Sequence, residues 1–269
     1  MTTPTSKTIE VAGIQVMVSD QGGGKSILLL HGGGGPQTVS GFAAMLAADG
    51  SRVITPTHPG FAGTPRPESL RSVEGLARLY TGVVADLAVT DVTIVGNSIG
   101  GWIAAEMALL DSPRIARFVL VDAVGIEVPG HPIADFFSLT PRQVAEHSYH
   151  DPDRFGIDPA KLSPEAQRVM AGNRSALTAY AGSAMSDRSL ATRLHGVTRP
   201  VLVVWGDSDR IVDPTYGRAF ASAIPGARFE VLADTGHLPQ LESPDQLLNA
   251  IRTFVAGDSV NDRARDARL

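Results

Sequence analysis

The chain has 269 residues, of which 43% are hydrophobic and 19% charged, with a formal net charge of −5. This is enough chain to bury a large core, and α/β folds of this size often form one domain. The charge, without a long block of one sign, disfavours nucleic acid or an anionic membrane as partner and favours a small-molecule substrate. The lack of cysteine excludes disulfides and thiolate chemistry, and with no apolar leader it predicts a cytoplasmic protein without a membrane anchor. A homodimer stays open.

Short β-rich runs and helix-period segments alternate along the chain. The expected strands cover residues 8–11, 14–19, 26–30, 52–55, 92–95, 118–121, 201–205 and 229–232. The expected helices cover residues 39–48, 73–87, 99–110, 214–223 and 244–255. The first two strands indicate an antiparallel hairpin at a sheet edge, and the alternation that follows predicts parallel strands with helices on both faces. The expected fold class is therefore α/β, with a mostly parallel eight-stranded sheet.

One long segment after the sixth strand interrupts this alternation. Residues 126–197 contain helix-like pieces separated by proline, glycine and aspartate, and no convincing strand. Since a structureless loop of this length is uncommon in a compact domain, we expect a helical cap there. The core would then comprise residues 1–125 and 198–257, followed by a disordered tail over 258–269.

A serine stands at the turn between the fifth strand and the helix that follows it, in Gly96-Asn97-Ser98-Ile99-Gly100. This G-x-S-x-G context is typical of a nucleophile whose oxygen is raised above the sheet by a strained turn, with glycines that let neighbouring backbones approach. A helix N-cap serine beside a glycine-rich packing contact is the alternative. Ser98 is our candidate nucleophile.

A glycine run follows the third strand in "SILLLHGGGGPQT". Backbone N–H groups must approach a developing oxyanion closely, and side chains would obstruct them. We expect the N–H groups of Gly33 and Ile99 to form the oxyanion hole. The run lacks the third glycine of a dinucleotide fingerprint, and "GGGKS" lacks the first glycine of a P-loop, so no cofactor is expected.

Of the seven histidines, only His237 lies in the loop after the last expected strand. That loop faces the carboxyl ends of the strands, where Ser98 should also lie, and an imidazole can take the proton of a serine hydroxyl. We interpret His31 and His58 as structural residues that hold their glycine loops. His147 and His150 could bind a metal, but no third ligand is evident, so no metal site is expected.

Four aspartates follow buried strands and could orient His237, namely Asp122, Asp207, Asp209 and Asp213. The residues alone do not decide between them. The chain order serine, aspartate, histidine is that of α/β-hydrolases.

The sequence resembles the α/β-hydrolase superfamily over nearly all of its core, including a glycine-proline loop in "HPGFAGTPRP" and a histidine loop in "GHLPQLESP". In that superfamily the pattern W-G-x-x-D supplies the triad acid. Here the pattern spans Trp205, Gly206 and Asp209, so the resemblance selects Asp209 as the acid.

Within the superfamily, "GNSIGG" and "HGGGGP" resemble the meta-cleavage-product hydrolases, which split carbon–carbon bonds in dienoate diketones. Those enzymes often have a tryptophan directly after the catalytic histidine and a cap arginine that binds the substrate carboxylate. Here Leu238 follows His237, and Arg174 is the candidate arginine. We expect substrate contacts from Gly32, Asn97, Arg174 and Leu238.

The expected function is a serine hydrolase that cleaves a small or medium carboxylic ester or lactone through an acyl-enzyme on Ser98. Apolar cap residues would select the substrate; they are Phe136, Phe137, Leu139, Tyr149, Phe155, Met170, Tyr180 and Met185. The alternatives are carbon–carbon cleavage, cofactor-free perhydrolysis, or a ligand-binding protein that kept the fold and lost the chemistry.

Overall fold

The structure, a computed structural model, describes the backbone of residues 4–266 and the side chains of residues 4–257. Within this part of the chain, eight strands form one sheet in the order β1-β2-β4-β3-β5-β6-β7-β8. The strands are β1 (Thr5–Val11), β2 (Ile14–Gly22), β3 (Ser26–Leu30), β4 (Arg52–Pro56), β5 (Val92–Asn97), β6 (Ile115–Val121), β7 (Val201–Gly206) and β8 (Arg228–Leu232). Strand β2 runs antiparallel to β1 and β4, and all other neighbouring strands are parallel. The mostly parallel α/β sheet predicted from the sequence is confirmed.

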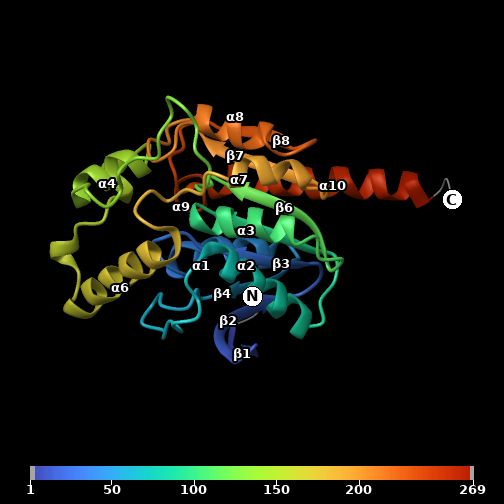
Figure 1. Ribbon diagram of the computed structural model, residues 1–269, viewed down its shortest axis with the longest axis horizontal. Coiled ribbons are helices and arrows are strands. Elements are labelled where there is room, and N and C mark those ends of the chain that lie inside the picture. Colours follow the sequence, from blue (N-terminus) through green and yellow to red (C-terminus); the bar gives the residue numbers. More distant parts are fainter. Residues whose placement is uncertain (1–3, 267–269) are drawn as a thin grey trace.

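Helices cover both faces of the sheet (Figure 1), which is why every residue of the central strands β3 and β5 is buried and most are apolar. In β3, Leu28 and Leu30 join the core with α2 (Val73–Asp86), α3 (Ile99–Leu109) and α8 (Pro214–Ser222). Leu29 points to the opposite face and joins the core with α1 (Gln37–Ala48) and α10 (Pro244–Asp266). Alternate residues of one strand therefore bury against different helices, as a period of two requires. The tail expected over 258–269 lies outside the described side chains and stays a prediction.

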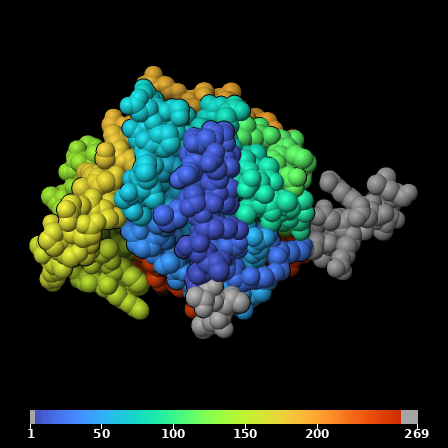
Figure 2. All heavy atoms as spheres, turned by 90° about the horizontal axis from the view of Figure 1, so that it is seen from below, coloured from blue at the N-terminus to red at the C-terminus, as the bar shows by residue number. Residues whose placement is uncertain are grey.

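The segment between β6 and β7, which we call the cap segment (residues 126–197), is helical. It contains α4 (Pro141–Ser148), α5 (Pro152–Phe155), η1 (Pro159–Lys161), α6 (Pro164–Ala181), α7 (Leu190–Arg193) and η2 (Leu194–Gly196). Figure 1 shows α4 and α6 together at one end of the molecule. In Figure 2 the cap segment protrudes from one side, while the β1–β2 hairpin (dark blue) crosses the face in view. The helical insertion after the sixth strand thus agrees with expectation, whereas its domain boundaries remain a prediction.

The residue directly before the cap segment is bridged to a later part of that segment. Gly125 and Ser186 form an isolated parallel bridge, and the Asp187 N–H donates to the Gly125 carbonyl at 2.8 Å. Gly125 has φ +127°, and a Cβ atom there would lie 2.6 Å from the Trp102 ring. A side chain at this position would therefore be both strained and crowded, so the start of the cap segment needs glycine.

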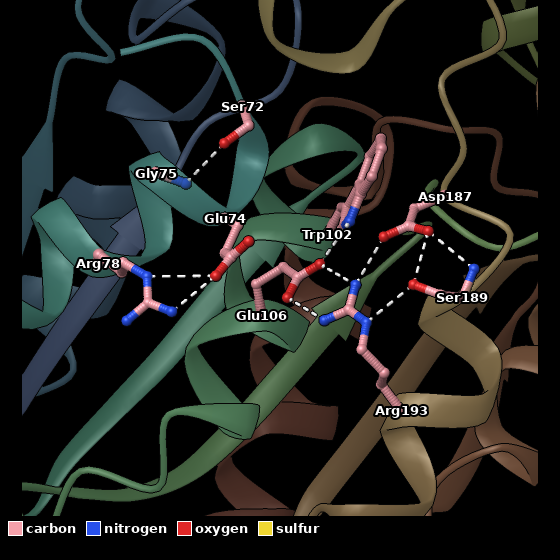
Figure 3. A network of polar contacts seen from close by, with 9 residues as sticks. All are labelled: Ser72, Glu74, Gly75, Arg78, Trp102, Glu106, Asp187, Ser189 and Arg193. Atoms are coloured by element: carbon pink, nitrogen blue, oxygen red, sulfur yellow. Dashed lines mark hydrogen bonds and ion pairs between the residues drawn. The ribbon is translucent and has the colours of Figure 1, made fainter. Parts of the chain in front are cut away.

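An ion pair between the half-buried Arg193 and the buried Glu106 fixes the returning chain to α3 (Figure 3). Arg193 donates to both carboxylate oxygens of Glu106 at 2.7 Å each, and to Asp187 at 2.7 Å. The Trp102 indole N–H also points to Glu106, at 3.4 Å. Because α3 begins directly after Ser98, this network joins the helix at the candidate nucleophile to the base of the cap segment.

No helix in the described part of the chain is long and apolar enough to cross a bilayer.

Candidate active site

Ser98 lies in the turn between β5 and α3, with φ 58° and ψ −121°. This conformation is uncommon for a residue with a Cβ atom and costs on the order of 1–3 kcal/mol. The Ser98 N–H donates to the Val121 carbonyl at 2.9 Å, which helps to hold the turn. Both flanking glycines are required, because a Cβ on Gly96 would overlap the Gly100 carbonyl and one on Gly100 would overlap the Leu30 carbonyl. The turn leaves the Ser98 side chain partly exposed.

Asp209 and His237 form a buried pair at the carboxyl end of the sheet. His237 Nδ1 lies 2.8 Å from Asp209 Oδ2. Asp209 Oδ1 accepts the backbone N–H groups of Ile211 at 2.8 Å and Val212 at 3.1 Å. These two donors hold the carboxylate, which in turn fixes the ring so that Nδ1 carries the proton and Nε2 is free to accept one. The pair is therefore a buried imidazole held in one orientation by a carboxylate.

The loop that carries His237 is tied to the turn that carries Ser98. The Asn97 side chain donates to the His237 carbonyl at 2.9 Å, and Gln240 Nε2 donates to Asn97 Oδ1 at 3.2 Å. Within residues 4–257 the Ser98 hydroxyl makes no direct hydrogen bond, and catalytic hydrogen bonds are often long in enzymes without substrate. The structure therefore brings the three elements together, and the catalytic role of Ser98, Asp209 and His237 remains a proposal.

Two buried histidines hold the glycine loop after β3. His31 Nε2 accepts the His58 N–H at 3.1 Å, and His31 Nδ1 faces the Gly32 carbonyl at 2.8 Å. His58 Nε2 faces the His31 carbonyl at 2.9 Å, and His58 Nδ1 lies 2.5 Å from the Tyr80 hydroxyl. Burial lowers the pKa of His31 to about 4, so both rings are neutral and each has one assignable tautomer. These contacts agree with the structural role predicted for both histidines.

The glycine loop lies beside Ser98 and beneath the cap segment. A Cβ on Gly32 would lie 3.2 Å from the Ser98 Cβ, and one on Gly33 would lie 2.9 Å from Leu177 of α6. Ile99 is the first residue of α3, where the backbone N–H has no partner within the helix. Gly33 and Ile99 thus occupy positions compatible with an oxyanion hole, and that assignment stays a prediction.

The other three candidate acids have different partners. Asp207 accepts the N–H groups of Asp234 at 3.1 Å and Thr235 at 3.2 Å. Asp213 caps α8 and lies 2.6 Å from His131 Nδ1. Asp122 is buried beside Asp209. Among these carboxylates, Asp209 is the one that contacts the His237 ring within hydrogen-bonding distance.

The two histidines considered for a metal are engaged elsewhere. His147 Nδ1 faces the Gln143 carbonyl at 2.8 Å, and His150 Nδ1 faces the Ser208 hydroxyl at 2.9 Å. Each therefore helps to fix the polypeptide near the end of α4.

Arg174 is bound within the cap segment. Its guanidinium donates to the carbonyl oxygens of Phe136 and Phe137, and it stacks over both rings at 5.1 and 5.2 Å. Leu238 is half-buried next to His237. The side-chain amide of Asn97 donates its hydrogen bond to the His237 carbonyl. Substrate contacts by these residues and by Gly32 stay predictions.

Sequence reasoning missed Asn173, which lies on the buried face of α6. Its Oδ1 accepts the Ala62 N–H at 2.8 Å, and its Nδ2 donates to the Gly34 carbonyl at 2.9 Å. The amide thereby joins the cap segment to two loops of the core. The only signal in the sequence is its position one turn before Leu177 and two turns before Tyr180, on one face of a helix.

Sequence reasoning also missed Glu242 in α9 (Pro239–Glu242). Its carboxylate accepts the N–H groups of Gly236 at 2.7 Å, Asp151 at 2.8 Å and His150 at 3.1 Å. One acidic side chain therefore fixes the residue before His237 to the cap segment. No local pattern predicts the contact with the cap segment, because Asp151 and His150 lie 91 and 92 residues away from Glu242 in the sequence.

Comparison with known proteins identifies the family. The model of the alpha/beta hydrolase family matches residues 27–250, and the chain belongs to this family. It is 27% identical over 264 residues to 2-hydroxymuconate semialdehyde hydrolase of Pseudomonas putida, covering 93% of this chain and 94% of that protein. It is 26% identical over 267 residues to Lipase 1 of Psychrobacter immobilis, covering 92% of this chain and 83% of that protein.

A solved structure with the same fold is the meta-cleavage product hydrolase from Pseudomonas fluorescens IP01. It has a TM-score of 0.77 and 23% identity, and the match covers 94% of this chain and 98% of that one. Relatives with different reactions thus share this architecture, so the fold does not select the bond that is cleaved.

Proposed function

We propose that the protein is a serine hydrolase that cleaves a small or medium carboxylic ester or lactone through an acyl-enzyme on Ser98. The observation that carries the proposal is the buried Asp209–His237 pair, at 2.8 Å, on a loop tied by Asn97 to the strained turn of Ser98. A strained serine, an oriented imidazole and a glycine loop at one end of a sheet are the parts that acyl transfer requires.

In this mechanism, His237 Nε2 removes the hydroxyl proton while Ser98 Oγ attacks the carbonyl carbon. The N–H groups of Gly33 and Ile99 stabilise the oxyanion, and Asp209 stabilises the imidazolium. Collapse of the tetrahedral intermediate expels the alkoxide, which takes the proton from His237. A water molecule, deprotonated by the same ring, then attacks the acyl-enzyme and releases the carboxylic acid.

Carbon–carbon cleavage is the second candidate, because a curated relative is named 2-hydroxymuconate semialdehyde hydrolase. The state of Arg174 favours ester cleavage. Its guanidinium is committed to the carbonyls of Phe136 and Phe137, so binding a substrate carboxylate would require breaking these contacts. Leu238, in place of a tryptophan after His237, favours the same choice.

A substrate panel separates these reactions. We expect p-nitrophenyl esters of short and medium acyl chains, or lactones, to be hydrolysed with a higher kcat/KM than dienoate diketones. If the diketones are the better substrates, the bond assignment is wrong. In that case Arg174→Ala would lower their kcat/KM strongly while leaving ester hydrolysis little changed.

Covalent labelling separates an enzyme from a binding protein. A fluorophosphonate should modify wild-type protein at Ser98, as located by peptide mass spectrometry, and should fail to modify Ser98→Ala. Wild-type protein that is never labelled and hydrolyses no ester would instead be a ligand-binding member of the family.

A further inference from the structure

Asp122 lies directly after β6 and has no role in the proposed mechanism, although it is buried beside Asp209. Its side chain is completely buried, at 0% exposure. Oδ1 accepts the Gly206 N–H at 2.8 Å, whereas Oδ2 has no hydrogen-bond partner in the described part of the chain. A charged carboxylate with one donor and no contact with water would strongly destabilise the fold.

Asp209 and His237 are titratable groups that lie close to Asp122. The ligating atoms of all three side chains lie within 4.8 Å of one another. Two buried carboxyl groups at this spacing do not both ionise, because the charges repel in a medium that screens them poorly. Two other carboxylates at this end of the sheet have different partners, since Asp207 accepts the N–H groups of Asp234 and Thr235, and Asp213 caps α8.

The hydrogen bonds indicate which of the two carboxyl groups carries the charge. Asp209 receives two backbone N–H groups and the His237 ring, a set of three donors. Asp122 receives one, from Gly206. The proton therefore belongs on Asp122, where it also gives Oδ2 the partner that this atom otherwise lacks.

We propose that Asp122 is a positioning residue that acts as a neutral carboxylic acid, with its Oδ2–H donating a hydrogen bond to the Asp209 carboxylate. The neutral acid gives the Asp209 carboxylate one more hydrogen-bond donor, and it places no second negative charge beside His237. This inference rests on the proposed function only in so far as Asp209 orients His237. The direction of the pKa shift agrees with it: burial, then the charge of Asp209, raise the pKa of Asp122 well above its ordinary value.

The first test needs no substrate. Because the folded state retains the Asp122 proton and the unfolded chain loses it above about pH 4, stability conferred by this proton is lost as the pH rises. Asp122→Asn, which is neutral at every pH, should therefore gain melting temperature relative to wild type between pH 5 and 8. For 269 residues the gain is about 2 °C per pH unit.

Asp207→Asn is the matched control at the same end of the sheet. Burial alone would raise the pKa of Asp207. Hydrogen bonds from Ser208, Thr235 and Asp234 outweigh burial, so the pKa of Asp207 lies below its ordinary value. Both its folded and unfolded forms are then ionised above pH 5, so the difference from wild type should stay constant between pH 5 and 8. A constant difference for Asp122→Asn as well would overturn the proposal.

The second test uses the pH profile of kcat/KM. Asp122→Ala removes the donor and should lower kcat about tenfold, whereas Asp122→Asn keeps a neutral donor and should restore most of it. The midpoint of the acidic limb should coincide in wild type and Asp122→Asn. If Asp122 were charged, its removal would move that midpoint down by at least about two pH units, because its carboxylate and the His237 ring have atoms within 4.8 Å of each other and the effective dielectric constant is about 20.

The two tests also separate this proposal from the proposed function. Failure of fluorophosphonate labelling would refute the serine hydrolase function. It would not affect the interpretation of the melting temperatures of wild type and Asp122→Asn. A labelled, active enzyme whose acidic limb moves in Asp122→Asn would keep the hydrolase and refute the neutral acid.

Discussion

Replacing Asp209 by asparagine should disable the enzyme while leaving the backbone around it intact. The asparagine Oδ1 can still accept the N–H groups of Ile211 and Val212, which Asp209 Oδ1 accepts at 2.8 and 3.1 Å. Its NH₂ group then faces His237 Nδ1, where the carboxylate oxygen now lies at 2.8 Å. The ring must turn its Nδ1 lone pair to this donor, so the proton moves to Nε2 and the ring can no longer accept one from Ser98.

The size of the effect follows from this tautomer change. The same substitution in a trypsin-type triad lowers kcat about 10⁴-fold, which corresponds to about 5.5 kcal/mol of activation free energy. If the asparagine side chain rotated by 180°, its NH₂ group would face the N–H groups of Ile211 and Val212. Donors would then face donors and these hydrogen bonds would be lost. We therefore expect a loss of about 10⁴-fold for Asp209→Asn with little change in KM.

Asp207→Asn is the comparison, because Asp207 lies two residues away, is exposed and binds Asp234 and Thr235 instead of His237. Its kcat should stay within about threefold of wild type. Both variants are assayed on the preferred p-nitrophenyl ester, after correction for folded protein by circular dichroism. If Asp207→Asn is the crippled variant, or if Asp209→Asn keeps more than a tenth of wild-type kcat, the assignment of the acid is wrong.

Three further outcomes are expected. Since burial holds the pKa of His31 at about 4 against an ordinary 6.5, this ring binds a proton only in the unfolded chain between these values, and the stability of wild type relative to His31→Gln should fall by about 3 kcal/mol as the pH drops through them. A calorimetric difference between the two proteins that stays constant over this window would contradict the buried neutral ring. Arg193→Ala leaves a buried carboxylate unpaired and should cost about 2 kcal/mol in urea unfolding, whereas Arg78→Ala, in the exposed ion pair of Figure 3, should cause no measurable change. Equal effects of the two would refute this difference. Asn173→Ala should lower kcat/KM about tenfold while Ser98 still reacts with a fluorophosphonate, because the cap segment loses its buried tie to the glycine loop; unchanged kinetics would exclude that role.

Much of the fold could be predicted because its signals are local. The strand at 26–30 and the helix that follows Ser98 are set by apolar runs and by glycines whose neighbours in sequence are also their neighbours in space. The turn of Ser98 is a further example, since Gly96 and Gly100 are required by backbone atoms within the same few residues or on the adjoining strand. The pattern predicts the ends of the elements less well, and β6 begins at Ile115 instead of 118.

The partners of the polar side chains could not be predicted in the same way. Four aspartates follow buried strands and cannot be distinguished by their local sequence, namely Asp122, Asp207, Asp209 and Asp213. Asp209 is selected among them by a family pattern. Only the packing of β7 against β6 and β8 places Asp209 on the His237 ring.

The sequence by itself determined the alternation of strands and helices, the glycine-flanked serine turn and the presence of a helical insertion. These follow from periodicity and backbone sterics, which act between residues close together in the chain. The tertiary structure decided that Asn97 holds the loop of His237 across 140 residues, that Asn173 joins the cap segment to the core across 139, and that Asp122 is buried against Asp209. Such contacts depend on strand order and on which faces pack together, so each polar group receives its partner only when the whole chain has folded.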